Sequence, residues 1–175
     1  MRLKGRTYAV LVADGVEDLE YWVTVMRIQE EGATVVSVGS DLDPHRGKNG
    51  LAVQAEKLAQ DVRADQFDGI VIPGGWAPDK MRRYPAIVDL VRTMNAQGKP
   101  IGIICHGGSV AISADIVSGR RVTGSLGIKD ALVNAGGTWV DEPAFRDGNQ
   151  VWGRVVADIP DFERELIALF VDSAG

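Results

Sequence analysis

The chain has 175 residues with a formal net charge of −5, and 45% of its residues are hydrophobic. This length fits one domain with its own core, and the acidic balance argues against nucleic acid or a membrane surface as the main partner. The single cysteine excludes an internal disulfide, and no apolar stretch approaches the roughly 20 residues that span a bilayer, so we expect one cytoplasmic domain, residues 1–175.

Apolar runs alternate with amphipathic stretches along the chain, which is typical of β-α-β units. The expected strands are 8–14, 33–39, 67–75, 99–108 and 120–125, with a weaker edge strand at 51–56. The expected helices are 17–32, 85–97, 109–119, 127–137 and 159–172. Segment 40–50 is expected to be a loop, and 138–154 a hairpin with DGN as its turn. The alternation predicts a mostly parallel sheet with helices on both faces.

Three of the expected strands end in residues of unusual chemistry. The first strand is followed by ADGVED, the third by PGGWAPDK and the fourth by CHGG. Since reactive groups of open α/β sheets gather outside the C-terminal ends of the strands, we expect these segments to form one site.

Cys105, the only thiol, follows the apolar run IGII and precedes two glycines and a helix. This pattern predicts a strand–turn–helix elbow, where unpaired N–H groups at the helix start favour the reactive thiolate. A free cysteine in such a place is also typical of a small buried hydrophobe. His106 is either a general acid or base or a surface histidine, and the turn must bend for it to touch the sulfur.

Glu17 and the glycines of the PGG segment each have two interpretations. Glu17 is stabilised in the first turn of a helix by the helix dipole, or it leans over the sulfur and shares a proton with it. Gly74 and Gly75 fit a tight turn, or Gly75 presents its N–H, together with that of His106, as an oxyanion hole. Asp79 is expected to cap the next helix.

Five segments in this order, ADGVEDLE, VIPGGWAPDK, GKPIGIICHGG, GIKDALVNAG and DGN, resemble the PfpI branch of the DJ-1/PfpI superfamily. The resemblance implies a flavodoxin-like three-layer α/β sandwich with a mostly parallel sheet, similar to class I glutamine amidotransferases. It implies Cys105 as the nucleophile, Glu17 as the acid beside it and Gly75 as an oxyanion donor. It also implies a dimer or hexamer in which His106 pairs with a neighbouring subunit's carboxylate at the position of Asp79.

Several residues depart from the family pattern. Asp79 stands where Glu is usual and is one methylene shorter, which leaves the trans contact slack. Trp76 stands where Arg is common, and Leu126 where a Tyr-Pro pair is common, so we expect a more apolar pocket wall. The expected substrate pocket consists of Gly74, Trp76, Gly107 and Leu126.

The main functional hypothesis is a cysteine-dependent hydrolase or lyase that acts on a small carbonyl compound. Cys105 would add to the carbonyl carbon, Glu17 would shuttle the proton, and the N–H groups of Gly75 and His106 would hold the oxyanion. The family resemblance implies glyoxalase, deglycase or peptidase activity of this kind. Small aldehydes are favoured over peptides because Trp76 leaves little room.

Two other hypotheses use the same cysteine. In one, the protein is a redox-sensing stress protein whose Cys105 is oxidised to sulfenic and sulfinic acid. In the other, it hydrates a specialised metabolite, as the related isonitrile hydratases do. No cofactor and no metal are expected, because one Cys and two His are too few for a zinc site of the usual kind.

Overall fold

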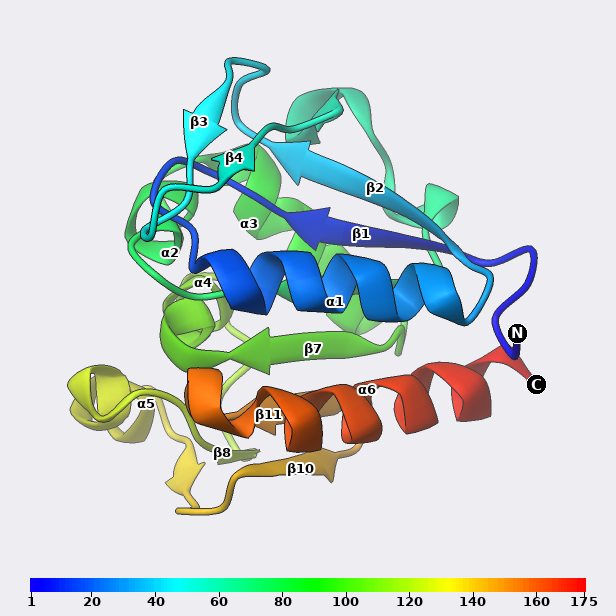
Figure 1. The fold of residues 1–175 in the computed structure, drawn as a ribbon. Coiled ribbons are helices and arrows are strands. Elements are labelled where there is room, and N and C mark those ends of the chain that lie inside the picture. Colours follow the sequence, from blue (N-terminus) through cyan, green and yellow to red (C-terminus); the bar gives the residue numbers. More distant parts are fainter.

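Seven short strands form the main sheet of the structure, a computed structural model that describes residues 1–175 (Figure 1). They are β1 (Thr7–Leu11), β2 (Thr34–Gly39), β5 (Lys57–Leu58), β6 (Gly69–Ile72), β7 (Ile101–Ile104), β10 (Ala144–Asp147) and β11 (Gln150–Gly153). Their order across the sheet is β10-β11-β7-β6-β1-β2-β5, and only β10 runs antiparallel to its neighbour. The central strands β6 and β7 are buried throughout, which explains why their sequences are continuous apolar runs.

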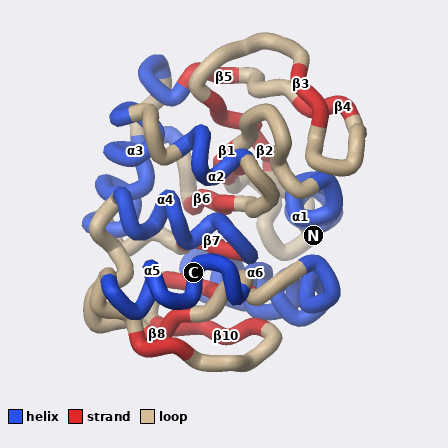
Figure 2. The backbone as a smooth tube through the Cα atoms, turned by 90° about the vertical axis from the view of Figure 1, so that its left-hand side faces the viewer, coloured by secondary structure: helices blue, strands red, loops and turns tan.

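Helices cover both faces of this sheet, as Figure 2 shows in a view along the strands. On one face lie α1 (Asp18–Glu30) and α6 (Ile159–Ala174), and on the other lie α3 (Pro85–Ala96) and α4 (Gly108–Ser113). The helices α2 (Ala77–Met81) and α5 (Lys129–Asn134) are short. Single-turn 3₁₀ helices occupy Ala59–Asp61, Ala64–Gln66, Cys105–Gly107, Leu126–Ile128 and Val156–Asp158. The three-layer α/β sandwich predicted from the sequence is thereby confirmed, and no helix combines the length and apolarity needed to cross a membrane.

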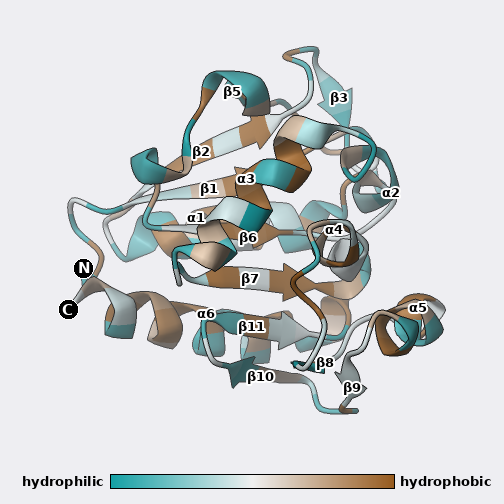
Figure 3. Cartoon of the chain, turned by 180° about the vertical axis from the view of Figure 1, so that it is seen from behind, coloured by the Kyte–Doolittle hydropathy of each residue, from teal (hydrophilic) through white to brown (hydrophobic).

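The core lies between the sheet and the two helical layers, and Figure 3 shows the central strands β6 and β7 mostly in the brown of hydrophobic residues. Trp152 of β11 and Phe162 of α6 are fully buried, and the rings of Tyr8 and Phe170 stack with their centroids 4.0 Å apart. These large side chains fix α6 against the sheet. Their burial is the main source of stability for this layer.

Three local expectations differ from the structure. Segment 51–56 is not an edge strand of the main sheet, because its β4 (Ala52–Val53) pairs in a separate hairpin with β3 (His45–Arg46), which lies inside the expected loop 40–50. Segment 120–125 contributes only β8 (Arg121–Val122), which pairs with β9 (Thr138–Trp139). The helix α2 follows PGGW without a signal that the sequence analysis used. All of these elements are only two to five residues long, too short for a hydrophobic period to be recognised.

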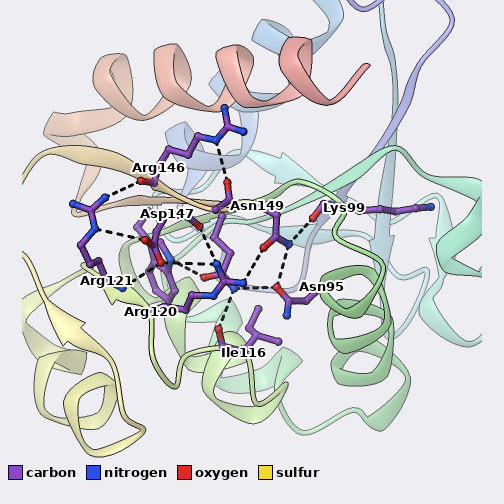
Figure 4. Close-up of polar contacts among 11 residues, drawn as sticks. Asn95, Lys99, Ile116, Arg120, Arg121, Arg146, Asp147 and Asn149 are labelled. Carbon is purple, nitrogen blue, oxygen red and sulfur yellow. Dashed lines mark hydrogen bonds and ion pairs between the residues drawn. The ribbon is translucent and has the colours of Figure 1, made fainter. Parts of the chain in front are cut away.

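The expected DGN turn joins β10 to β11 at the end of the sheet opposite Cys105, and a polar network anchors it (Figure 4). Asn149 donates through Nδ2 to the carbonyl of Lys99 at 2.9 Å and to Oδ1 of Asn95 at 3.2 Å. The buried Gln150 donates to Asn95 and to the carbonyl of Ile116, both at 3.0 Å. Because the side-chain amides hydrogen-bond to one another and to backbone carbonyls, the network holds the hairpin in place.

Candidate active site

The candidate site lies at the C-terminal ends of β1, β6 and β7. The chain runs from β1 to β2 and then crosses to β6 on the other side of β1, so the strand order reverses between β1 and β6. In open α/β sheets such a reversal leaves a crevice outside the strand ends. The three segments singled out in the sequence all meet there.

Cys105 adopts a left-handed backbone conformation, with φ of +58°. Ile104 before it is extended, and the residues after it enter a 3₁₀ turn that leads into α4. Such a conformation costs about 1–3 kcal/mol for a residue other than glycine, and it persists where the surrounding structure imposes it. The structure therefore contains the strand–turn–helix elbow that the sequence predicts, and it leaves the thiol half-buried.

The sharp turn brings the two side chains of the CHGG segment together. Nδ1 of His106 lies 3.4 Å from Sγ of Cys105, a contact that a straight strand would prevent. Burial and the positive charge of Lys48 lower the pKa of His106 below its ordinary value of 6.5. His106 is therefore neutral at pH 7.

The PGG segment closes over the sulfur through two glycines. The N–H of Gly74 donates to Oε2 of Glu20 at 2.6 Å, and a Cβ placed on Gly74 would lie 2.7 Å from both this oxygen and Cβ of Cys105. Gly75 has a φ of +77° and forms an isolated β-bridge with Val16. The backbone N–H groups of Gly75 and His106 both point at the sulfur of Cys105. This is the pair of donors expected for an oxyanion hole.

The carboxylate beside the sulfur is that of Glu20, and the expectation that Glu17 holds this place is wrong. Glu20 is fully buried and lies within hydrogen-bonding range of the Cys105 thiol, and its Oε1 has no nitrogen or oxygen partner. Glu17 caps α1 instead. Its Oε2 accepts the N–H of Leu19 at 2.8 Å and that of Glu20 at 2.9 Å.

The helical period explains this difference between two nearby glutamates. Glu17 precedes α1, so its side chain folds back onto the first exposed N–H groups, as its helix-dipole interpretation requires. Glu20 lies on the face of α1 that carries the buried residues Tyr21, Thr24 and Ile28. The available signal for Glu20 was a carboxylate on the buried face of an amphipathic helix, and the prediction rested on Glu17 instead.

Burial controls the protonation of the Cys105–Glu20 pair. It raises the pKa of the Cys105 thiol to about 12, and the negative charge of Glu20 adds to this shift, while the N–H groups of His106 and Gly75 oppose it. Burial also raises the pKa of Glu20 to about 7. Desolvation and the negative charge of Glu20 thus oppose the thiolate that the N–H groups at the helix start were expected to favour. Between pH about 7 and 12 the two groups hold one proton between them.

The hairpin β3–β4 is held against the start of α1 by buried acids. The carboxylate of Asp18 accepts the N–H of Asn49 at 2.6 Å and of Leu51 at 2.7 Å, and Glu17 Oε1 accepts the Asn49 Nδ2 at 2.9 Å. As a result Lys48 lies over the site, with Nζ 5.8 Å from the ring centroid of Trp76. Lys48 was not predicted as a site residue, because its segment of the sequence shows only turn residues.

A cleft of about 340 Å³ opens next to His106. It is lined by Lys48, Gly75, Trp76, Asp79, Lys80, His106 and Ser109. Trp76 is the only hydrophobic residue among them, so the expected apolar wall is wrong.

Of the other residues expected in the pocket, Gly74 and Gly107 pack behind the elbow. A Cβ placed on Gly107 would lie 2.3 Å from the Ile72 carbonyl oxygen. Leu126 does not line the cleft and is 76% exposed beside it.

Asp79 does not contact His106 of the same chain. It lies in the first turn of α2, where its carboxylate is exposed and paired with Arg83 one helical turn later, and it makes no capping hydrogen bond. Asp79 and His106 line the same cleft without a hydrogen bond between them. No group of three or more His, Cys, Asp or Glu side chains is arranged to hold a metal ion.

The model of the DJ-1/PfpI family matches residues 6–169. This chain belongs to the DJ-1/PfpI family. It is 36% identical over 159 residues to Deglycase PfpI of Pyrococcus furiosus, across 91% of this chain and 96% of that protein. It is also 36% identical over 164 residues to Putative cysteine protease YraA of Bacillus subtilis, across 92% of this chain and 96% of that protein.

The same fold is found in one domain of a larger protein whose structure has been solved. It is a two-domain protein from Anabaena variabilis with DJ-1/ThiJ/PfpI-like and ferritin-like domains, and it matches with a TM-score of 0.91 and 36% identity. The match covers 93% of this chain and 47% of the two-domain chain. The names of the curated relatives support an enzyme of the PfpI kind at the level of the family.

Proposed function

We propose that this protein is a cysteine-dependent enzyme that acts on a small carbonyl compound, in the manner of a glyoxalase or deglycase. The observation that carries the proposal is the buried Glu20 carboxyl within hydrogen-bonding range of the elbow thiol of Cys105. A group that takes up a proton near pH 7 lies next to the only thiol of the chain. This arrangement suits general acid–base assistance to a nucleophile.

The first step transfers the thiol proton of Cys105 to Glu20 as the sulfur attacks the carbonyl carbon. A sulfur–carbon bond forms, the carbonyl π bond breaks, and its electron pair moves to the oxygen. The N–H groups of Gly75 and His106 stabilise the negative oxygen. Glu20 then returns the proton to that oxygen, which gives a hemithioacetal and restores the carboxylate.

A 2-oxoaldehyde proceeds from this adduct without an external oxidant. Removal of the former aldehyde hydrogen as a proton, with protonation of the neighbouring ketone oxygen, gives an enediol. Loss of the proton from the first hydroxyl and protonation of the former ketone carbon then give the thioester of a 2-hydroxy acid. Water hydrolyses the thioester and releases the Cys105 thiol. Glu20 and the neutral His106 are the groups near enough to the sulfur to carry these protons.

The size of the cleft favours small carbonyl compounds over polypeptides. Its volume is about 340 Å³, and Trp76 and Lys48 stand over its mouth. The relatives' names include both deglycase and cysteine protease, so peptide cleavage remains the alternative within the same chemistry.

We also propose a homo-oligomer, a dimer or hexamer, in which Asp79 of one subunit pairs with His106 of another. Trp76 and Leu126, beside the cleft, are 61% and 76% exposed, which is consistent with a surface that a neighbouring subunit covers. The carboxylate of Asp79 is accessible for such a contact. A cytoplasmic location is likewise still a prediction.

Turnover of methylglyoxal, compared with cleavage of casein, tests the proposed function. We expect lactate from methylglyoxal, no casein fragments, and complete loss of activity in Cys105→Ala. Glu20→Gln should retain the fold and lose about 10²–10⁴-fold in kcat, the usual contribution of a general acid or base. Casein cleavage that depends on Cys105, with no lactate, would instead establish the peptidase.

The redox-sensor hypothesis has one observation in its favour. The same two N–H groups and the Glu20 carboxyl would also stabilise oxygen atoms added to the sulfur of Cys105. The intact mass after mild peroxide treatment separates the two functions. Stoichiometric addition of two oxygens, in a protein that turns over neither methylglyoxal nor an isonitrile, would favour the sensor over both the carbonyl enzyme and the hydratase.

A further inference from the structure

Lys48 is an unpaired cation beside the candidate nucleophile. Two lysines line the cleft, and Lys80 forms an ion pair with Asp14 at 2.6 Å. The ammonium group of Lys48 forms neither an ion pair nor a hydrogen bond. It makes a cation–π contact with Trp76, 5.8 Å from the ring centroid. In a chain with 24 acidic and 19 basic residues, a lysine left without a carboxylate at this place needs an explanation.

The position of Lys48 is fixed by its own hairpin. The Lys48 N–H donates to the carbonyl of Val16 at 2.8 Å, and Asn49, the next residue, is held by both Asp18 and Glu17. Gly47, the preceding residue, packs so closely that a Cβ there would lie 2.4 Å from the Asp18 carboxylate. Two buried acids thus hold the backbone on both sides of Lys48 against the start of α1.

The ammonium of Lys48 acts on the reacting groups. Lys48 and His106 line the same cleft, and the charge of Lys48 lowers the pKa of His106 and partly offsets the raised pKa of Glu20. Because Nδ1 of His106 lies 3.4 Å from Sγ of Cys105, an anion held by Lys48 inside the cleft would lie near the thiol. The cation–π contact with Trp76 limits where the flexible lysine side chain points.

We propose that Lys48 binds an anionic group of the substrate, so that the preferred substrates are 2-oxoaldehydes that also carry a carboxylate. The choice of substrate rests on the proposed function, whereas the anion subsite rests on the geometry of Lys48 alone. One such compound is 4,5-dioxopentanoate, which has the charge that Lys48 would bind and the 2-oxoaldehyde group that the hydrogen shift requires.

Alkylation of Cys105 by two matched reagents tests the subsite without any enzyme turnover. Iodoacetate carries a carboxylate, and iodoacetamide is its neutral counterpart; both alkylate the only thiol of the chain, so intact mass reports the rate. The ratio of the two rates cancels changes in the reactivity of the sulfur. We expect the ratio of the iodoacetate rate to the iodoacetamide rate to fall about tenfold in Lys48→Met and to recover in Lys48→Arg. A tenfold change corresponds to the loss of one charge-assisted contact at a partly exposed site.

Lys129→Met is the matched control, since Lys129 lies over Trp139 with the same geometry, 5.7 Å from the ring centroid, away from the cleft. This variant should leave the ratio unchanged. The effect of Lys48 should shrink as salt screens the charge. If Lys48→Met slows both reagents equally, Lys48 acts on the thiol and the anion subsite is refuted.

The substrate part of the proposal has its own readout. Lys48→Met should lower kcat/KM for 4,5-dioxopentanoate about tenfold more than kcat/KM for methylglyoxal. Equal losses for the two substrates, or a wild-type protein that turns over methylglyoxal and not 4,5-dioxopentanoate, would overturn the substrate class while the proposed function stands. A protein that turns over neither compound but keeps the alkylation ratio would refute the proposed function and retain the anion subsite.

Discussion

The chemistry depends on one proton shared by the half-buried thiol of Cys105 and the buried carboxyl group of Glu20. Cys105 is held in a strained left-handed conformation. The carboxyl group of Glu20, in the first turn of α1, is buried and therefore not solvated by water. Neither group is strongly reactive alone, because burial favours the neutral form of each. Together they supply a base for the thiol and an acid for the product oxygen, with the backbone N–H groups of Gly75 and His106 fixed beside them.

The contact between the two residues requires glycine at position 74. We predict that Gly74→Ala lowers kcat at least 10²-fold, because the new Cβ would lie 2.7 Å from both the Glu20 carboxylate and Cβ of Cys105. The thermal midpoint should fall by only a few degrees, since the rest of the fold is unaffected. Steady-state kinetics together with a melting curve separate the two effects. A wild-type kcat in Gly74→Ala would show that the close packing at Gly74 has no part in catalysis.

At this scale the sequence revealed the nucleophile and not its partner. Cys105 could be recognised because its neighbours, IGII before it and two glycines after it, describe the elbow. Glu17 and Glu20 lie three residues apart in one acidic segment, and only the direction of each side chain separates a helix cap from a buried acid. Lys48 was not accessible from the sequence, because its role depends on a hairpin folded across the site.

Helix α1 connects the site to two other elements, the hairpin β3–β4 at its start and α6 along its side. The hairpin is attached through Asp18, which is 2% exposed and accepts two backbone N–H groups. The contact with α6 includes Glu163, which is 5% exposed, accepts a hydrogen bond from the hydroxyl of Thr24 and has one carboxyl oxygen without a partner. Both contacts bury a carboxyl group, and each predicts a different effect of mutation.

Asp18→Asn should loosen the hairpin. An amide offers one acceptor oxygen where the carboxylate offers two, so one of the N–H groups of Asn49 and Leu51 loses its partner. We predict at least tenfold faster amide hydrogen exchange at one of these positions and a loss of about 1–3 kcal/mol of stability. Asp43→Asn, in the exposed part of the same segment, is the control. Unchanged exchange at both amides would show that the hairpin is held by other contacts.

The α1–α6 contact should make stability depend on pH. Burial raises the pKa of Glu163 to about 7, so its neutral form is stable in the fold and its ionised form is costly. Its contribution is fully present below the unfolded pKa near 4.5 and is lost as pH rises through about 7. We predict that Glu163→Gln gains about 2 kcal/mol relative to wild type between pH 5 and pH 8, measured by urea unfolding. A constant difference at all pH values would contradict a buried, titrating Glu163.

The molecule as a whole places its reactive residues by topology. Parallel strands direct their C-terminal ends to one side, and the reversal of strand order between β1 and β6 opens a crevice outside these ends, where Cys105 follows β7. The sequence predicted this architecture well, because long apolar runs alternate with helices. It failed for the two-residue strands β3, β4, β8 and β9, whose pairing depends on tertiary contacts.

Assembly is the remaining question at this scale, because Asp79 does not contact His106 within one chain. Asp79→Ala and Cys105→Ala should each be inactive, and subunits exchanged between them should form mixed dimers with one complete site. We predict recovery of about a quarter of wild-type activity after random exchange into two-fold dimers. Full activity of Asp79→Ala alone, or no recovery on mixing, would rule out the trans contact.

The pH dependence of Cys105 alkylation by iodoacetamide, in wild type and in Glu20→Gln, tests the shared proton most directly. With Glu20 as the base, the wild-type rate should rise through pH about 7, where this carboxyl ionises, and the rise should be absent in Glu20→Gln. A wild-type rate that stays low until the thiol itself ionises at high pH, with the same profile in Glu20→Gln, would contradict the account.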